Sequence, residues 1–325
     1  MRKIERTALK AAAFVIGLAF NPLIHPANAE QITGLTTLNG LIRFDSATPG
    51  TILNNAGISG LQAGESIVGI DFRPVNGQLY GVSSASRIYT IDPTTGLATF
   101  LVTLSTPLTT ASSYGINFNP VSDRLRIVHS DARINPQSNQ NLRVDVATGT
   151  VTVDGLLTPA MVVSPLDPNI GAGSYTNSFS GATSTTLYDI DFFRDRLVIQ
   201  NTPNSGTLVR VGELAPLGTP PIGGDITNAR LGFEISGLSG IAYASLTSPA
   251  TNLSSLYTID LTTGTATLVG LIGNGITLQG LAVPAGSAVP EPTSMVLFGI
   301  GMVSIGTLRF LKRKRSSLSL LRPSD

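Results

Sequence analysis

Three polar side chains recur at one position of a repeated four-residue pattern. Asp71, Asn117 and Asp191 each stand between large apolar residues, as in Gly69-Ile70-Asp71-Phe72. Alternate side chains of an extended strand point to opposite sides, so this polar column points away from its apolar neighbours. Carboxylate and amide oxygens are ligands that Ca²⁺ prefers, and a pair of carboxyls can hydrolyse a glycosidic bond.

We expect the column to be structural, with each side chain bonded to the backbone of a neighbouring strand, because buried polar groups usually form hydrogen bonds. Three side chains are few for a calcium ion, so Ca²⁺ held by Asp71 and Asp191 is the alternative. A glycosidase needs two carboxyls about 5–10 Å apart, and Asp71 with Asp191 is the pair we can nominate. The chain has no Trp, on which sugars often stack. We therefore predict no catalytic residues and no cofactor.

Composition excludes several other chemistries. The chain has no Cys, which excludes thiol catalysis, zinc–thiolate sites and iron–sulfur clusters. It has two His, and His25 lies in a segment that we expect to be removed, so sites with two imidazoles are excluded too. His129 is followed by Ser130 and Asp131, but adjacent side chains point in opposite directions, so no catalytic triad forms. We expect His129 at the surface, at the start of a long loop.

The charge of the exported part is acidic. Residues 30–288 contain eleven Arg, no Lys and seventeen Asp and Glu, which is a net charge of −6. Nucleic-acid binding needs basic patches that neutralise phosphates. We therefore predict no nucleic-acid partner.

Short alternating strands separated by turns surround the polar column. Residues 30–284 are rich in Gly, Thr, Ser, Val, Ile and Leu and show no amphipathic helix, which indicates an all-β fold. The pattern that opens each unit recurs five times, at 69–72, 115–118, 189–192, 240–243 and 280–283. Turns of the form Asp92-Pro-Thr-Thr-Gly96 recur after a later strand. Four antiparallel strands in each repeat predict a β-propeller of about five blades.

The two ends of this region complete one blade. The last opening strand, 277–283, has no strands after it, whereas 31–37, 38–45 and 50–53 read as strands two, three and four. Their pairing closes the ring and removes an exposed sheet edge. The wide spacing between Gly115 and Asp189 leaves room for long loops or a sixth blade.

Two polar stretches in the middle of the chain are candidate recognition loops, since loops on a rigid scaffold often carry binding residues. One runs from His129 to Gln140 and the other from Ser174 to Thr186. Arg133 and Tyr175 are the side chains that we would test first.

Both ends of the chain carry export signals. Residues 1–29 contain four basic residues, an apolar stretch and Ala27-Asn28-Ala29, which is typical of a cleaved signal peptide. At the other end Pro290-Glu291-Pro292 precedes an apolar run over 293–311 and the cluster Lys312-Arg313-Lys314-Arg315. The run is 19 residues long, close to the ~20 that a membrane-spanning helix needs. The positive-inside rule places the basic tail, 312–325, in the cytoplasm.

This C-terminal module resembles the PEP-CTERM sorting signal. The resemblance implies an exosortase-type processing enzyme, an intermediate anchored in the inner membrane, and release to the cell surface or beyond. Residues 287–292 then form a linker behind a propeller domain at 30–286.

The propeller region resembles the uncharacterised bacterial "domain of unknown function 4394" family. The resemblance rests on the strings at 69–80, 140–145, 175–179, 186–191 and 196–200. It implies a secreted propeller-like fold and brings no catalytic residues. We expect a non-enzymatic module that binds exopolysaccharide or matrix protein, with a carbohydrate hydrolase using the channel carboxylates as the alternative.

Overall fold

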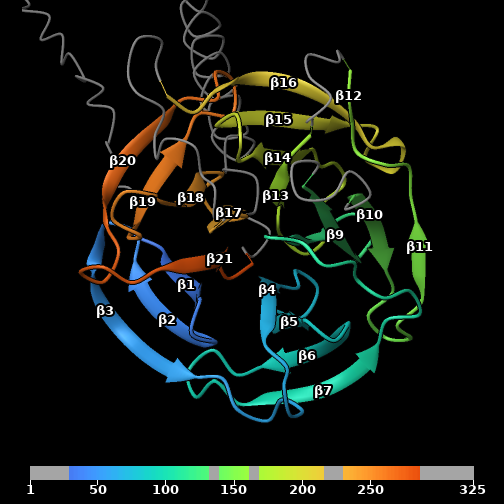
Figure 1. The fold of residues 1–325 in the computed structure, drawn as a ribbon, viewed down its shortest axis with the longest axis horizontal. Helices are drawn as coiled ribbons and strands as arrows, with labels where there is room; N and C mark the ends of the chain where they lie inside the picture. The colour runs from blue at the N-terminus through green and yellow to red at the C-terminus, as the bar shows by residue number, and fades with distance from the viewer. Residues whose placement is uncertain (1–28, 132–138, 161–167, 216–229, 286–325) are drawn as a thin grey trace, which may run out of the picture.

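The computed structural model describes residues 29–131, 139–160, 168–215 and 230–285. These residues form five β-sheets arranged around a central axis, which are the blades of a β-propeller (Figure 1). The predicted all-β, five-bladed fold is therefore confirmed. Within the described ranges no helix is long and apolar enough to cross a membrane. The predicted signal peptide and C-terminal helix lie outside these ranges.

Each blade has four antiparallel strands, and one blade has a fifth strand at its outer edge. From the axis outward, blade 1 contains β21 (Leu278–Ala282), β1 (Gln31–Thr36), β2 (Gly40–Asp45) and β3 (Thr48–Gly57). Blade 2 contains β4 (Ile67–Phe72), β5 (Leu79–Ser83), β6 (Arg87–Ile91) and β7 (Ala98–Thr103). Blade 3 contains β8 (Gly115–Asn119), β9 (Arg124–Ser130), β10 (Asn139–Val144) and β11 (Val151–Val153).

The remaining two blades come from the second half of the chain. Blade 4 contains β13 (Ile170–Tyr175), β14 (Leu187–Asp191), β15 (Arg196–Asn201), β16 (Thr207–Glu213) and the parallel edge strand β12 (Thr158–Pro159). A 3₁₀ turn, η1 (Pro203–Ser205), connects β15 to β16. Blade 5 contains β17 (Leu231–Ile235), β18 (Ala242–Thr247), β19 (Ser254–Ile259) and β20 (Ala266–Leu271).

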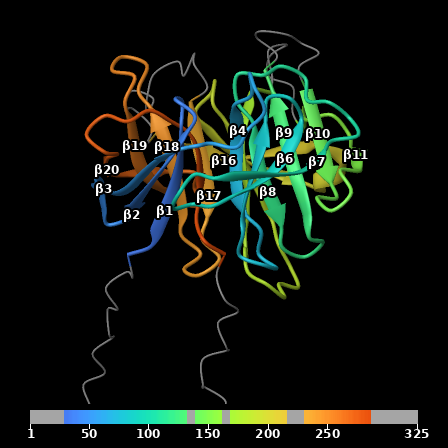
Figure 2. The same cartoon turned by 90° about the horizontal axis from the view of Figure 1, so that it is seen from below.

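The chain ends close the ring as the sequence predicted. β21 pairs antiparallel with β1, so one C-terminal strand and three N-terminal strands share blade 1. The innermost strands all begin on one face of the ring, which we call the mouth face. On the opposite face, the terminal face, β1 begins and β21 ends; Figure 2 shows the blades from the side.

Two of the five predicted opening strands were wrong. The segments 189–192 and 240–243 lie in or beside β14 and β18, which are the second strands of their blades. The true innermost strands are β13 and β17. β13 carries Gly173 where the pattern expected a large apolar residue, whereas Ser174 of β13 and Glu234 of β17 stand at the polar position of the pattern.

The recurring Asp-to-Gly turns join the outer two strands and hold adjacent blades together. In each turn the Gly N–H donates to the Asp carbonyl at 2.8 Å, as for Gly149 and Asp145. Gly149 has a φ of +73°, and a Cβ added there would lie 2.2 Å from the carbonyl oxygen of Thr103 in blade 2. Glycine is required because the backbone is left-handed and a neighbouring strand occupies the side-chain position.

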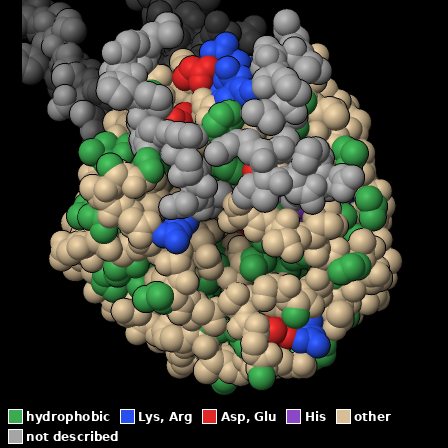
Figure 3. Space-filling view, in the orientation of Figure 1, with side chains coloured by type: hydrophobic (Ala, Val, Ile, Leu, Met, Phe, Trp, Pro, Cys, Tyr) green, Lys and Arg blue, Asp and Glu red, His purple; other side chains and the backbone are tan. Residues whose placement is uncertain are grey.

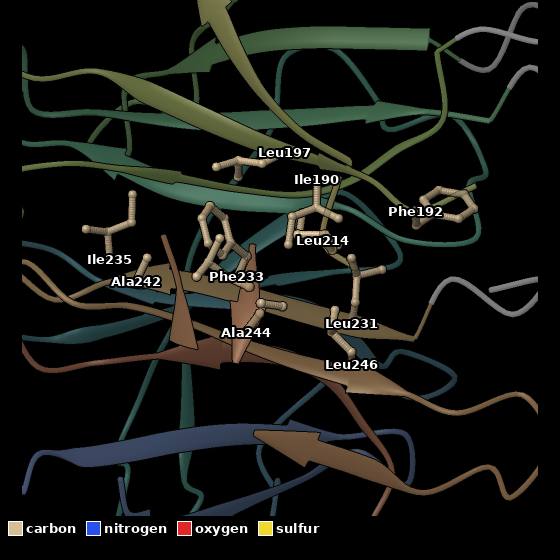
Figure 4. Close-up of a cluster of buried hydrophobic side chains, with 13 residues drawn as sticks. Ile190, Phe192, Leu197, Leu214, Leu231, Phe233, Ile235, Ala242, Ala244 and Leu246 are labelled. Atoms are coloured by element: carbon tan, nitrogen blue, oxygen red, sulfur yellow. The ribbon is translucent and has the colours of Figure 1, made fainter. Parts of the chain in front are cut away.

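Five hydrophobic clusters fill the five spaces between blades. The largest contains 13 buried residues between blades 4 and 5, including Phe192, Leu197 and Phe233 (Figure 4). The cluster between blades 3 and 4 is the smallest and contains five buried residues: Val128, Leu157, Ile170, Val198 and Leu208. Polar side chains occupy the rest of that interface, and they form part of the site described next.

Candidate functional site

A polar column lines the central channel. Register and backbone contacts place Asp71, Asn117, Ser174 and Glu234 at equivalent positions on β4, β8, β13 and β17, with Ala282 on β21. Asp71 and Asn117 lie where the sequence predicted. Asp191 does not belong to the column, because β14 is the second strand of blade 4. Ser174 of β13 and Glu234 of β17 complete the column, and the sequence did not predict either residue.

The column is held by hydrogen bonds from each blade to the next. Asp71 Oδ2 accepts the N–H of Phe118 at 2.6 Å, and Asn117 Oδ1 accepts the N–H of Tyr175 at 2.9 Å. Ser174 Oγ likewise accepts the N–H of Ile235 at 2.9 Å. Bonding to a neighbouring strand's backbone was the predicted role of Asp71 and Asn117. The column therefore links blades 2, 3, 4 and 5 in sequence.

Glu234 connects the column across the channel. Its Oε2 accepts a hydrogen bond from Asn117 Nδ2 at 2.8 Å, and its Oε1 accepts one from Ser174 Oγ at 3.3 Å. Burial raises the pKa of Asp71 to about 8. Burial, and then the charge of Asp71, raises the pKa of Glu234 well above its ordinary value. Low-dielectric surroundings disfavour both charges, so burial favours the neutral form of each carboxyl.

Space at the mouth of the channel is very small. The cavity there has a volume of about 10 Å³, which is at most room for one water molecule. Glycines on the innermost strands allow this close approach: a Cβ at Gly115 would lie 2.7 Å from Gly173 N, and one at Gly232 would lie 2.4 Å from Leu281 N. Figure 3 shows the mouth face, whose described part carries few charged side chains.

The predicted pairing of Asp71 with Asp191 is not found. Asp191 ends β14, where its Oδ1 accepts the N–H groups of Phe193 and Arg194 at 3.3 Å and stabilises a turn. Burial raises the pKa of Asp191 to about 6. Within the described residues no three His, Cys, Asp or Glu side chains gather as a metal site. Asp71 Oδ1 has no hydrogen-bond partner there, so it is the oxygen of the column that a cation would meet.

A larger cleft lies on the terminal face between blades 3 and 4. Its volume is about 610 Å³, and its walls include Asn119, Arg126, Arg143, Tyr175 and Asn204. Tyr175 was predicted to lie on a surface loop, but it belongs to β13 and only 1% of it is exposed. Its hydroxyl accepts a hydrogen bond from Arg126 Nε at 3.2 Å. Arg133, the other predicted loop residue, lies outside the described residues.

Arg126 replaces an aromatic side chain of the repeat. Three other blades place a tyrosine opposite the polar column, at Tyr80, Tyr188 and Tyr243, whereas blade 3 places Arg126 opposite Asn117. Tyr80 packs edge-on against Phe118 of the next blade at 5.1 Å. Arg126 instead points toward blade 4. The interface between blades 3 and 4 therefore has hydrogen bonds where the interface between blades 2 and 3 has an aromatic contact.

The guanidinium of Arg126 is buried and well bonded. Its Nη1 donates to Asn141 Oδ1 and Asp154 Oδ2, both at 2.6 Å, and its Nη2 donates to Asn204 Oδ1 at 2.8 Å. Arg143 lies directly opposite Arg126 on the adjacent strand. Two like charges in that arrangement repel. Asp154 bridges them, because Arg143 Nε and Nη2 also donate to it, at 2.7 and 2.9 Å.

The electrostatics of the cluster shift several pKa values. Hydrogen bonds from Arg143 and Arg126 outweigh the effect of burial and lower the pKa of Asp154, and the same pairing raises the pKa of Arg143. Asp189 of β14 is fully buried, and burial raises its pKa to about 8 although Arg126 opposes this. Burial therefore favours the neutral form of Asp189, whereas the two arginine partners of Asp154 favour its carboxylate form.

His129 is buried, which corrects the expectation that it lies at the surface. Its Nε2 lies 3.0 Å from Thr109 Oγ1 and 3.2 Å from Gln140 Oε1, and its ring contacts Tyr114 edge-on at 5.0 Å. Burial lowers its pKa, so the ring is neutral at pH 7. These contacts anchor the loop that leads into β8.

Comparison with known proteins supports the two resemblances. A family model described as "Domain of unknown function (DUF4394)" matches residues 40–282, and one described as "PEP-CTERM protein-sorting motif" matches residues 288–314. The sorting motif supports export to the cell envelope or surface by exosortase-type machinery. No protein of curated function matches the chain.

Several solved structures match the chain at low sequence identity and with TM-scores below 0.5. A chain from the nidogen–laminin complex is 15% identical, with 80% of this chain and 100% of that chain covered and a TM-score of 0.43. A Bacteroides thetaiotaomicron protein of unknown function is 11% identical, with 78% and 56% covered and a TM-score of 0.43. A Lactobacillus plantarum protein is 14% identical, with 75% and 82% covered and a TM-score of 0.39. The match over 40–282 spans most of the chain, which therefore belongs to the DUF4394 family.

Proposed function

We propose that this chain is a non-enzymatic binding module, exported through its sorting signal, that binds extracellular polysaccharide or matrix protein. The proposal combines two observations. The C-terminal motif supports export of the chain, and the lining of the cleft between blades 3 and 4 includes hydroxyl, amide and guanidinium groups.

The small space at the mouth of the channel is the observation that most favours binding over catalysis. A glycosidase needs two carboxyls with a sugar and, in inverting enzymes, a water molecule between them. Asp71 and Glu234 are the carboxyls that meet in the channel, but both are at most 1% exposed and the mouth cavity measures about 10 Å³. Both also participate in the hydrogen bonds that join the blades. These features support a structural role for the channel carboxyls.

Binding and turnover can be separated in one series of measurements. The full-length chain, purified in mild detergent, is applied to an array of bacterial and plant polysaccharides and to extracellular matrix extracts. Any saccharide that binds is then incubated with the protein, and new reducing ends are measured. We expect binding without new reducing ends. Hydrolysis that Glu234→Gln abolishes, in a variant that keeps the wild-type melting temperature, would contradict the proposal.

A further inference from the structure

The cleft between blades 3 and 4 has the dimensions of a ligand site. Its volume of about 610 Å³ lies within the 300–1,000 Å³ that is common for small-molecule sites. Three connections on the terminal face form its walls: β8 to β9, β13 to β14, and β15 to β16. Rigid strands and η1 support these connections, so the walls have defined positions.

The walls of the cleft present hydrogen-bonding groups suited to a polyhydroxylated ligand. Apolar carbon makes up most of the lining surface, on which the carbon–hydrogen faces of a sugar ring can pack, and hydroxyl and amide side chains lie among it: Asn119, Ser122, Thr183, Ser184, Thr185, Thr202 and Asn204. Thr183 and Ser184 are exposed, so their hydroxyls can exchange bonds with water for bonds with a ligand. An apolar ligand would leave these groups unsatisfied, and each such loss weakens binding.

Arg143 contributes a guanidinium group to the lining of this cleft, and part of that group is exposed. Its side chain is 33% exposed, whereas that of Arg126 is 2% exposed. Asp154 occupies Nε and Nη2 of Arg143, and within the described residues Nη1 has no hydrogen-bond partner. Arg126 and Arg143 both donate to the carboxylate of Asp154, so two guanidinium groups share one carboxylate at this site. This positive site stands out in a region whose net charge is −6.

We propose that this cleft binds carboxylate-bearing saccharides, with Arg143 pairing the carboxylate and the surrounding hydroxyl and amide groups bonding the sugar hydroxyls. The inference rests on the proposed function and names the ligand class and the site. Guanidinium groups form short, strong hydrogen bonds with carboxylates. The ion pair is partly exposed, so added salt weakens the complex.

Isothermal titration calorimetry with the full-length chain in mild detergent tests the ligand class. The probes are a hexamer of galacturonic acid, monomeric galacturonic acid, neutral cellohexaose and a hexaglutamate peptide. We expect the acidic hexasaccharide to bind at least about tenfold more tightly than cellohexaose or hexaglutamate. A monomer that binds as tightly as the hexamer still supports the site and identifies a free sugar acid as its ligand. A hexaglutamate peptide that binds as tightly as the hexasaccharide would overturn the saccharide assignment.

Three variants test the location. Arg143→Gln removes the cation and is expected to weaken binding of the acidic hexamer about tenfold or more, because hydrogen bonds to charged groups are strong. Thr183→Phe fills the cleft while leaving the arginines and Asp154 unchanged, and it should weaken binding of every saccharide that binds. Arg43→Gln is the matched control. Arg43 lies on the third strand of blade 1 and pairs with Thr33, just as Arg143 lies on the third strand of blade 3 and pairs with Arg126.

The outcomes separate this inference from the proposed function. Loss of binding in Arg143→Gln and Thr183→Phe, with wild-type binding in Arg43→Gln, supports the cleft as the site. If both cleft variants bind the acidic hexamer as tightly as wild type does, the site assignment is wrong and saccharide binding stands. If the wild-type chain binds no saccharide at all, the inference and the polysaccharide part of the proposed function both fail. Melting temperatures confirm that each variant is folded.

Discussion

The buried carboxyls predict that the protein loses stability as the pH rises through neutrality. Burial raises the pKa values of Asp71 and Asp189 to about 8 from 3.8. Between pH 3.8 and 8 such a carboxyl keeps its proton when folded and releases it when unfolded. Unfolding therefore releases a proton, and the free energy of unfolding falls as pH rises.

The size of the effect follows from linkage. Each such carboxyl lowers the free energy of unfolding by about 1.4 kcal/mol per pH unit while only the folded state holds the proton. From pH 6.5 to pH 8 this amounts to about 2 kcal/mol for each group. That loss is measurable against a total stability of roughly 5–15 kcal/mol for a typical domain.

In this pH window Glu234, whose pKa is also raised, adds a slope of the same sign, and the other shifted groups act mainly outside it. The pKa of His129 is lowered from 6.5, so its stabilising effect is lost only as the pH falls below about 6.5. Asp191 has a pKa of about 6 and changes the slope mainly below the window. Asp154 has a lowered pKa, so its contribution is lost only in acid.

Asp71→Asn is the variant that tests the assignment. An asparagine keeps an oxygen for the Phe118 N–H and has nearly the size and the neutrality of the protonated carboxyl. We expect wild-type stability to within about 1 kcal/mol at pH 6.5, and a slope toward pH 8 that is shallower by about 1.4 kcal/mol per pH unit. Asp92→Asn is the control, because Asp92 is exposed in a turn and its pKa is lowered.

Urea unfolding at pH 6.5, 7.0, 7.5 and 8.0 measures the slopes. The chain has seven Tyr and no Trp, so tyrosine fluorescence and far-UV circular dichroism are suitable probes. A wild-type stability that rises over this range would refute the burial argument. Equal slopes for wild type and Asp71→Asn would show that Asp71 does not titrate as its environment requires.

Four further predictions test the fold and the sorting signal. Gly149→Ala should lower the free energy of unfolding more than Gly181→Ala, by about 1–2 kcal/mol, because both residues have positive φ but a Cβ is obstructed only at Gly149; urea unfolding gives the difference. Deleting residues 31–45 removes β1 and β2 and exposes β21, so light scattering should show aggregation, and a monomer with an unchanged melting temperature would contradict ring closure. Replacing Pro290-Glu291-Pro292 with alanines should keep the protein in the membrane fraction on immunoblots, and equal release of both forms would refute the sorting mechanism. EDTA should leave the melting temperature unchanged, because hydrogen bonds already hold the polar column; a fall that Ca²⁺ reverses would establish the calcium alternative.

The sequence was sufficient for the ring and its closure, because the repeat and its turns are local features. Asp-to-Gly turns such as Asp92–Gly96 depend on a side-chain cap and a left-handed glycine, which a few adjacent residues determine. β13 was missed because it packs close to β8 near the axis, where Gly173 replaces the large apolar residue of the pattern. In β17 the pattern Gly232-Phe233-Glu234-Ile235 parallels Gly69-Ile70-Asp71-Phe72, so an alignment that accepted Glu could have found Glu234.

The candidate cleft could not be predicted in the same way. Arg126, Asp154 and Asn204 meet from three separate segments of two blades, and sequence spacing alone does not place them together. One signal was visible: the strand Arg124-Leu125-Arg126 has Arg where Gln78-Leu79-Tyr80 has Tyr. When a charged residue replaces the aromatic residue of a repeat, and that position faces the next blade, hydrogen-bond partners are expected on that blade.

The position of the cleft follows from how a propeller is stabilised. Each blade packs against two others, and four of the five interfaces retain large hydrophobic clusters. Among the described residues, the cluster between blades 3 and 4 has five buried apolar members, and Arg126 with its partners adds hydrogen bonds across this interface. A buried guanidinium is tolerated when its charge is paired and its donors are satisfied. The ring can therefore keep its stability in four interfaces and use the polar fifth to present Arg143 and the surrounding hydroxyl groups to a ligand.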